Sequence, residues 1–310
     1  MCMTLSQAVM GKVYNLGDGS RKIRRRPVDP LQPDLAAALA AWRDRVHANA
    51  AQVERYREEA PRADHFAPLV QNFQVDPRRQ GDPTLEALLA LARPGETWLD
   101  IGAGAGRYAL PLALRVGEVV ALDASPAMLD GLRVGMAEHA ITNVRPLAGR
   151  WPLPDPPRAD VALIVNVGYD IADIGPFLDA MERAATRLCV AVMFARRPTW
   201  GADALWPAVH GEPRVPLPAL PELLALQLAR RRVFDVRMGA AQPLAHDSFE
   251  AALRFARIQT WVQPGGAKDR RLQELLRERL IERDGRFAFD WDPPLQGVVT
   301  WRPGQTIPPG

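Results

Sequence analysis

The stretch WLDIGAGAGRYALPLAL at residues 98–114 constrains the fold of this chain more than any other part of the sequence. An apolar run ends in Asp100 and is followed by Gly102, Gly104 and Gly106, after which a helical apolar pattern begins. Glycine lacks a Cβ and tolerates positive φ, so such a loop turns tightly and lets its backbone approach a ligand. At the carboxyl end of the first strand of an open parallel sheet, the loop would face the crevice where ligands bind.

The segments that surround this loop alternate between strand and helix patterns. The patterns predict strands at residues 97–101, 118–122, 143–148, 161–167 and 188–194, with helices at 107–116, 126–139 and 174–186. Such alternation is typical of a parallel sheet with helices on both faces. Residues 233–238 and 297–301 are predicted to add further strands.

The rest of the chain is predicted to be largely helical around that sheet. Residues 1–33 are expected to form a flexible basic arm and residues 34–81 a helical N-terminal segment. Residues 82–310 are expected to form one domain, with helical additions at about 198–232 and 245–285. At the start of this domain, Asp82 and Pro83 have the residue types of an N-cap and a first helical position.

Charge and composition narrow the class of protein. Residues 1–30 hold six basic and two acidic residues, a net charge of +4, while the whole chain carries +3, so the remainder sums to −1. The basicity therefore belongs to the arm. The apolar runs are too short to span a membrane, and the start of the chain lacks the apolar region of a secretory signal. These features predict a cytoplasmic protein without a membrane partner.

The cysteines and histidines give no sign of a disulfide framework or a metal site. Cys2 lies in the arm and Cys189 within a predicted strand, and no histidine pair has the i, i+4 spacing of metal ligands on a helix. We therefore expect no bound metal.

The spacing of the glycines distinguishes two kinds of nucleotide-binding loop. In the dinucleotide fingerprint G-x-G-x-x-G, the third glycine would stand at Arg107. The pattern D-x-G-x-G-x-G instead resembles the first motif of class I S-adenosylmethionine-dependent methyltransferases. The resemblance extends over roughly residues 80–200, with Asp123 at the end of the second strand, Gly149-Arg150-Trp151 before the fourth, and PDPPRADVALIVNVGY at residues 154–169.

This resemblance implies an α/β Rossmann-like fold with a seven-stranded, mostly parallel sheet and S-adenosyl-L-methionine as cofactor. It implies that Asp123 holds the ribose hydroxyls, that Asp100 lies near the methionine ammonium, and that Met128 and Trp151 flank the adenine, although ordinary packing would also explain the last two. The predicted cofactor-binding set is Asp100, Gly102, Ala103, Gly104, Gly106, Asp123, Ala124, Met128, Arg150, Trp151 and Asn166.

The sequence identifies a cofactor site better than a catalytic one. Methyl transfer is an in-line displacement that depends mainly on alignment, so a dedicated catalytic residue is not required. Tyr169 and His210 are weak candidates for such a residue. Asn166-Val167-Gly168-Tyr169 lacks the two prolines of the Asn/Asp-Pro-Pro-Tyr motif found in amino-group methylases. The residues expected around the acceptor are Tyr56, His65, Phe66, Tyr169, Asp170, Trp206, His210 and Glu212, with the N-terminal segment as a lid.

Four functions remain open at this point. The first is methyl transfer to a small-molecule acceptor, favoured by the near-neutral body of the chain. The second is an RNA or protein methyltransferase that uses the basic arm. A non-catalytic scaffold is disfavoured by the intact glycines and carboxylates, and a nicotinamide dehydrogenase by Arg107.

Overall fold

A computed structural model of the chain describes residues 33–60, 63–196, 201–241, 245–283, 285–290, 292 and 294–308. The predicted basic arm therefore lies outside the described residues, except for Pro33. Within the described part, no helix combines the length and the apolar character needed to cross a membrane.

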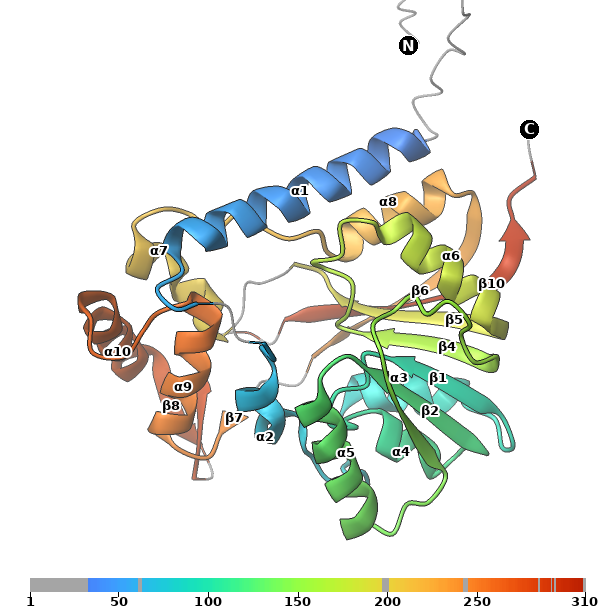
Figure 1. Cartoon of the computed structure of the whole chain (residues 1–310), viewed down its shortest axis with the longest axis horizontal. Helices are drawn as coiled ribbons and strands as arrows, with labels where there is room; N and C mark the ends of the chain where they lie inside the picture. The colour runs from blue at the N-terminus through green and yellow to red at the C-terminus, as the bar shows by residue number, and fades with distance from the viewer. Residues whose placement is uncertain are drawn as a thin grey trace, which may run out of the picture.

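The centre of the molecule is a seven-stranded sheet (Figure 1). Its spatial order is β3 (Val144–Ala148), β2 (Glu118–Asp123), β1 (Thr97–Ile101), β4 (Ala159–Val165), β5 (Ala185–Phe194), β10 (Leu295–Thr306) and β6 (Arg232–Ala240). The first five strands pair in parallel, while β10 is antiparallel to both β5 and β6. The order changes direction between β1 and β4, so the loops that follow these two strands meet at one crevice. The predicted α/β Rossmann-like fold is confirmed.

Helices cover both faces of this sheet because the strands alternate apolar side chains between their two faces. In β1, Trp98 and Leu99 are both fully buried but belong to different cores. One core includes α1 (Leu35–Tyr56), α6 (Ile174–Ala184) and α8 (Leu220–Ala229), and the other includes α3 (Pro83–Leu91), α4 (Ala109–Ala113) and α5 (Pro126–Glu138).

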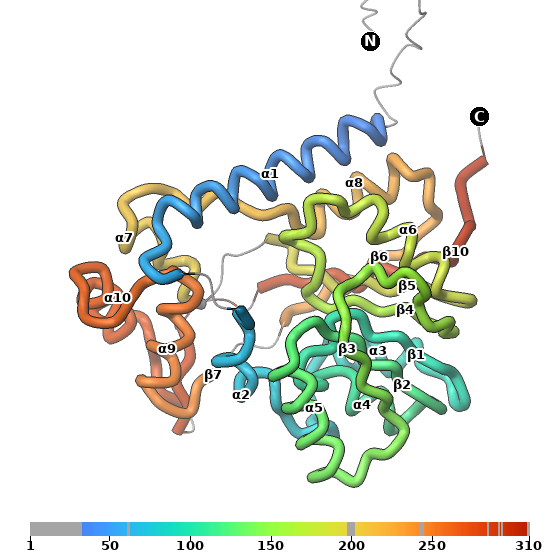
Figure 2. Tube along the Cα trace, in the orientation of Figure 1, coloured from blue at the N-terminus to red at the C-terminus, as the bar shows by residue number. Residues whose placement is uncertain are grey.

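A second, smaller body lies beside the crevice end of the sheet (Figure 2). We call residues 245–290 the insertion, because they separate β6 from β10. It holds β7 (Ala245–His246), α9 (Phe249–Thr260), α10 (Ala267–Arg279), β8 (Leu280–Arg283) and β9 (Arg286–Phe289), with an antiparallel sheet in the order β7-β9-β8. In its core, Leu253 and Leu272 pack with Ala202, Leu205 and Val209 of η2 (Gly201–Leu205) and α7 (Trp206–His210).

The N-terminal segment connects the insertion to the main sheet. After α1, residues 63–75 form η1 (Ala67–Leu69) and α2 (Val70–Phe73), and Figure 1 shows α2 between α9 and α5. Leu69 packs in one cluster with Ala105 of the glycine loop, Met128 of α5 and Phe255 of α9. The insertion is thus docked against the loop that the sequence singles out.

Three predicted elements differ from the observed ones. The helix expected at 107–116 is shortened to Ala109–Ala113. The strand expected at 161–167 ends at Val165, because Asn166 adopts a left-handed φ of 57°. The pattern KDRRLQELLRERLIE at residues 268–282 predicts one helix, but the observed helix stops at Arg279 because Leu280–Arg283 pairs with β9. The additions are therefore not purely helical.

Candidate functional site: a carboxylate-lined crevice beside the glycine loop

The glycine loop is fixed to the end of the neighbouring strand. The backbone N–H groups of Gly102 and Ala103 both donate to the carbonyl of Leu122, at 2.8 and 3.0 Å. Gly102 has φ +78°, and a Cβ there would lie 2.5 Å from a methyl carbon of Val167. Both the conformation and the close approach therefore require glycine at this position.

The other two glycines of the loop serve different purposes. At Gly106, φ is +89° and a Cβ would lie 2.5 Å from Leu132 Cδ1 and 2.9 Å from Leu110 Cγ, so this glycine lets the loop pack on α5. At Gly104, φ is +56° and a Cβ would meet only Met128 Sδ, at 3.8 Å. Protein packing therefore leaves room beside Gly104, which is where a ligand could lie against the loop.

Asp123 joins the end of β2 to the same loop. Its Oδ2 accepts a hydrogen bond from the Gly104 N–H at 2.7 Å, and its Oδ1 accepts one from the Ser125 N–H at 2.8 Å. The side chain remains half-buried. Each carboxylate oxygen has further lone pairs, so Asp123 can accept hydrogen bonds from a ligand while it keeps the loop in place.

A second carboxylate comes from the N-terminal segment and was missed by sequence reasoning. Asp64 Oδ2 accepts a hydrogen bond from the Ser125 hydroxyl at 2.7 Å, and Ser125 Oγ in turn caps α5 by accepting from the Met128 N–H. Burial opposes ionisation of Asp64, but this hydrogen bond and those from the Phe66 and Ala67 backbone outweigh it and lower its pKa. No motif around Asp64 indicates this contact, because its partner lies 61 residues away.

Asp100, the third carboxylate, differs from the other two because it is unpaired. It is 2% exposed, and no hydrogen bond or ion pair joins its side chain to any described residue. Burial, assisted by the negative charge of Asp123, raises its pKa to about 7. A cationic group placed beside Asp100 would relieve this penalty, so the crevice has the electrostatics of a cation site.

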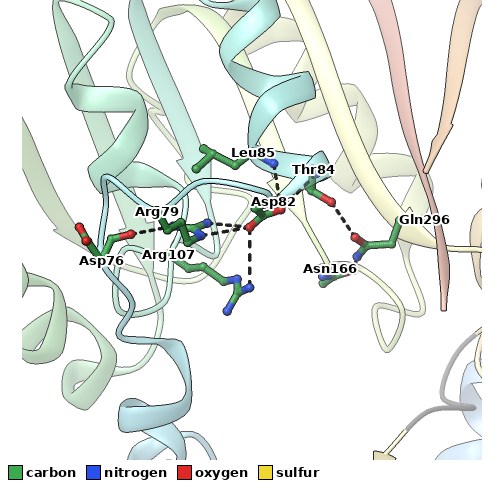
Figure 3. A network of polar contacts seen from close by, with 8 residues as sticks. All are labelled: Asp76, Arg79, Asp82, Thr84, Leu85, Arg107, Asn166 and Gln296. Atoms are coloured by element: carbon green, nitrogen blue, oxygen red, sulfur yellow. Dashed lines mark hydrogen bonds and ion pairs between the residues drawn. The ribbon is translucent and has the colours of Figure 1, made fainter. Parts of the chain in front are cut away.

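A network of polar contacts links the start of α3 to the residue that follows the glycine loop (Figure 3). Buried Asp82 caps α3 by accepting from Thr84 and Leu85 N–H groups, as the sequence predicts for this residue. Its other oxygen accepts two hydrogen bonds from Arg79, at 3.1 and 3.0 Å, and lies 3.8 Å from Arg107. Arg107, immediately after the glycine loop, is therefore held by α3.

The same network continues to the end of β4. The Thr84 hydroxyl donates to Gln296 Oε1 at 2.9 Å, and Gln296 Nε2 donates to Asn166 Oδ1 at 3.0 Å (Figure 3). Asn166 Oδ1 also accepts from the Tyr169 hydroxyl at 2.9 Å, and that hydroxyl accepts from the Phe194 N–H. Tyr169 is fully buried, and its hydroxyl both donates and accepts within the protein. Its position favours holding the loop after β4 over touching a substrate.

The remaining predicted cofactor residues lie in different surroundings. Met128 is buried beside Gly104, and Ala103 is buried in the loop, while Ala124 and Arg150 are exposed. The Trp151 ring packs edge-on against Phe177, and its indole N–H donates to the Phe177 carbonyl at 3.1 Å. Trp151 is thus part of the core beneath α6. The cofactor contacts of the predicted set stay predictions.

The residues expected around the acceptor fall into separate groups. Tyr56, Trp206 and His210 form one aromatic cluster, in which the Trp206 and His210 ring centroids lie 4.0 Å apart. His210 Nε2 lies 2.8 Å from the Thr260 carbonyl oxygen, and burial lowers the pKa of the ring. Glu212 accepts hydrogen bonds from Gln52 and Arg55, His65 stacks on Trp261, and both Phe66 and Asp170 are exposed. The catalytic roles of Tyr169 and His210 stay predictions.

Cys189 lies within β5, as expected from the sequence, and is fully buried. Burial raises the pKa of its thiol, which keeps the sulfur protonated and unreactive at neutral pH.

Residues 99–187 match a family model described as a methyltransferase domain. No curated protein sequence is significantly similar to the chain. Among solved structures, a SAM-dependent methyltransferase from Thiobacillus denitrificans in complex with S-adenosyl-L-homocysteine is 14% identical, with a TM-score of 0.47, 79% of this chain and 99% of that chain covered.

Two further solved structures have a comparable degree of similarity. Magnesium protoporphyrin IX methyltransferase from Synechocystis PCC 6803, with bound SAH, is 12% identical, with a TM-score of 0.45 over 86% of this chain and 99% of that chain. The YcgJ protein of Bacillus subtilis is 18% identical, with a TM-score of 0.46 over 71% of this chain and 97% of that chain.

Proposed function

We propose that this chain, whose residues 99–187 match a methyltransferase-domain model, transfers a methyl group from S-adenosyl-L-methionine to a small-molecule acceptor. The observation that carries the proposal is the contact between Asp123 Oδ2 and the Gly104 N–H at 2.7 Å, beside a glycine whose open side meets only Met128. A carboxylate and a bare stretch of backbone are thereby held at one edge of the sheet.

The described residues fit the cofactor chemically. Asp123 has free lone pairs for the two ribose hydroxyls, and hydrogen bonds to a charged acceptor are stronger than neutral ones. Buried Asp100 lacks a cationic partner among the described residues, and the methionine ammonium would supply one. The proposed contact set also keeps Gly102, Ala103, Gly104, Gly106, Ala124, Arg150, Trp151 and Asn166, with Met128 beside Gly104.

The cofactor supplies an electrophilic methyl group, so the protein has to align an acceptor with it and keep water away. The cluster of Leu69, Ala105, Met128 and Phe255 supports the second task, because it covers the glycine loop with apolar side chains from the N-terminal segment and the insertion. Alignment alone accounts for a large part of the acceleration in reactions of this kind. No general base is therefore part of the proposal.

The small-molecule acceptor is favoured by the enclosed surroundings of the loop and by the near-neutral charge of residues 31–310. The alternative, methylation of RNA or protein, depends on the basic arm, which lies outside the described residues. Removal of residues 1–30 separates the two. A large, salt-dependent loss of activity on RNA would favour the alternative.

Isothermal titration calorimetry tests the cofactor assignment. We expect micromolar binding of S-adenosylhomocysteine and little binding of NADH. Asp123→Ala should weaken the former by about 2–3 kcal/mol, because charged hydrogen bonds to the ribose are lost. Asp123→Asn keeps the shape of the side chain and separates lost charge from a loosened loop.

The matched control is Asp235→Ala, since Asp235 is an exposed carboxylate on β6, away from the crevice. The affinity of Asp235→Ala for S-adenosylhomocysteine should equal that of the wild type. The cofactor assignment would be wrong if both Asp123 variants bound S-adenosylhomocysteine as the wild type does. It would also be wrong if the protein bound NADH more tightly than S-adenosylhomocysteine. Mass analysis of a cell extract incubated with enzyme and cofactor would then identify an acceptor by its gain of one methylene unit.

A further inference from the structure

A cavity of about 140 Å³ lies where three parts of the molecule meet. Its walls come from residues 68–75 of the N-terminal segment, from Arg107 after the glycine loop, and from the β7–α9 part of the insertion together with Arg286. Figure 1 shows these parts side by side at α2, β7 and α9. The cavity exceeds the room that one water molecule needs but is smaller than pockets that enclose whole ligands, so its size suits one chemical group.

His246 lies in the wall of this cavity and is 2% exposed. Its Nδ1 is 3.4 Å from the amide nitrogen of Asn72. An amide nitrogen only donates, so Nδ1 must accept, and the proton of the neutral ring then sits on Nε2. Burial and the nearby charge of Arg286 lower the pKa of His246 to about 4, against a weaker opposing effect of Asp247, so the ring is neutral at pH 7.

The Nε2 atom of His246 has no hydrogen-bond partner and is shielded from solvent within the part of the chain that the structure describes. A buried donor without an acceptor is destabilising, and such groups are rare in native proteins. An oxygen atom of a ligand would satisfy it once the side chains that shield Nε2 move aside for the ligand.

The charges around the cavity are mostly positive. Arg107, Arg254 and Arg286 line it together with the single carboxylate of Asp247, which pairs with Arg286 at 3.1 Å. Arg254 forms no ion pair with any described residue. The carboxylate near Arg107 is Asp82, at 3.8 Å, and it already accepts two hydrogen bonds from Arg79. The cavity therefore has an excess of positive charge over its own carboxylates.

The cavity also adjoins the proposed site of methyl transfer. Leu69 and Phe255 line it, and both belong to the apolar cluster that covers Ala105 and Met128. Arg107 directly follows Gly106 in the loop. A molecule anchored in the cavity would thus extend past the glycine loop.

We propose that this cavity binds an anionic oxygen group of the methyl acceptor, a carboxylate or a phosphate, through the Nε2–H of His246 and the guanidinium of Arg254. A neutral ring N–H donates one hydrogen bond, and a guanidinium donates two in a plane that matches either anion. That the bound molecule is the methyl acceptor rests on the proposed function, whereas the binding of an anion in the cavity does not. The chain would then select acidic acceptors.

Nuclear magnetic resonance of the histidine rings tests this inference without cofactor. The chain has five histidines, so the ring signals of His246 can be assigned from their loss in His246→Gln. The full-length protein is titrated at pH 7 with inorganic phosphate, with acetate, and with sodium chloride at equal ionic strength. We expect saturable shifts of the His246 signals with phosphate or with acetate, and none with chloride. The anion that saturates identifies the group.

Arg254→Gln is the decisive variant, because Arg254 is exposed and its replacement should leave the fold intact. We expect anion affinity to fall at least tenfold in this variant. Arg279 is an exposed arginine on α10 that does not line the cavity, so Arg279→Gln should bind the anion as the wild type does. Equal affinity in Arg254→Gln and wild type, or no saturable shift with either anion, overturns the proposal.

The two proposals fail in different ways. Absence of S-adenosylhomocysteine binding would remove the methyl-transfer function and leave the anion titration unaffected. If S-adenosylhomocysteine binds normally but the His246 signals do not shift with either anion, only the proposal of an anionic acceptor is wrong.

Discussion

The crevice beside the glycine loop and the cavity beside the insertion lie next to each other but are built differently. In the crevice, Asp123 bonds Gly104 across 19 residues, both within one strand–loop–helix–strand unit. In the cavity, Asn72 meets His246 across 174 residues. Local connections produce a recognisable motif, whereas the cavity depends on how the N-terminal segment and the insertion dock.

The two regions also differ in charge. The crevice holds the carboxylates Asp64, Asp100 and Asp123, while the cavity is lined mainly by arginines. Such a division suits a reaction between a cofactor that carries a sulfonium and an ammonium and an acceptor that carries an anion. Each substrate would be drawn to its own side of the loop.

The largest effect is expected from uncoupling the two regions. Phe255→Ala removes a ring, 6% exposed, that packs the insertion on Leu69, Ala105 and Met128. We expect the free energy of unfolding to fall by about 3–5 kcal/mol, as for other buried Phe→Ala changes. Hydrogen exchange should then speed up in the insertion and in residues 64–75, while β1 and β2 remain protected.

Phe249→Ala is the matched control on the same helix. Phe249 packs on the core that the insertion shares with η2 and α7 and is not part of the cluster around Phe255, so exchange in residues 64–75 should remain as in the wild type. Equal responses to both variants would mean that the apolar cluster does not join the two regions.

A somewhat smaller effect is expected within the glycine loop. Gly106→Ala places a Cβ 2.5 Å from Leu132 Cδ1 at φ +89°, and strain plus overpacking should cost about 2–5 kcal/mol of stability. Gly104→Ala meets only Met128 at 3.8 Å and should cost about 1–2 kcal/mol, from conformational strain alone. Denaturant unfolding measures both.

For ligand binding, we expect the opposite order of effects. Gly104→Ala should weaken the binding of S-adenosylhomocysteine more than its small stability cost suggests, because the added methyl group faces the space proposed for the cofactor. If folded Gly104→Ala protein binds the ligand normally, the crevice is not the cofactor site.

The smallest effect concerns pH. The pKa of Asp100, about 7 in the free protein against 3.8 ordinarily, should fall when an ammonium binds beside it. Ligand affinity should therefore decrease by about tenfold, or about 1.4 kcal/mol, for each pH unit below 7, and level off above it. The same raised pKa means that the ligand-free protein loses stability as pH rises from about 4 to 7. In this range Asp100 stays protonated in the folded state but is ionised in the unfolded state, so a rise in pH favours unfolding.

Calorimetry between pH 5.5 and 8 measures this dependence. Asp100→Asn should bind more weakly and with a flat pH profile over the same range. A slope that persists in Asp100→Asn would assign the titration to another group.

The sequence predicts the parts of the molecule whose contacts are local. The glycine loop, the strands on either side of it and the N-cap at Asp82 follow from short patterns, since their partners lie within one unit of the fold. The helical pattern of residues 268–282 includes Leu280, Ile281 and Glu282, and nothing in these residues reveals that they will pair with β9. For the same reason Asp64 and His246 carry no signal in the sequence, as each meets its partner only after the N-terminal segment has docked.

The position of β10 affects how this protein matures during synthesis. In the described part of the chain, β6 pairs with no strand of the sheet except β10, and Gln296 at the start of β10 completes the hydrogen bonds of Asn166. A nascent chain can fold the glycine loop early, but β6 exposes an unpaired edge until residues 295–306 leave the ribosome. Unpaired strand edges favour aggregation, so this edge is vulnerable throughout translation of the insertion.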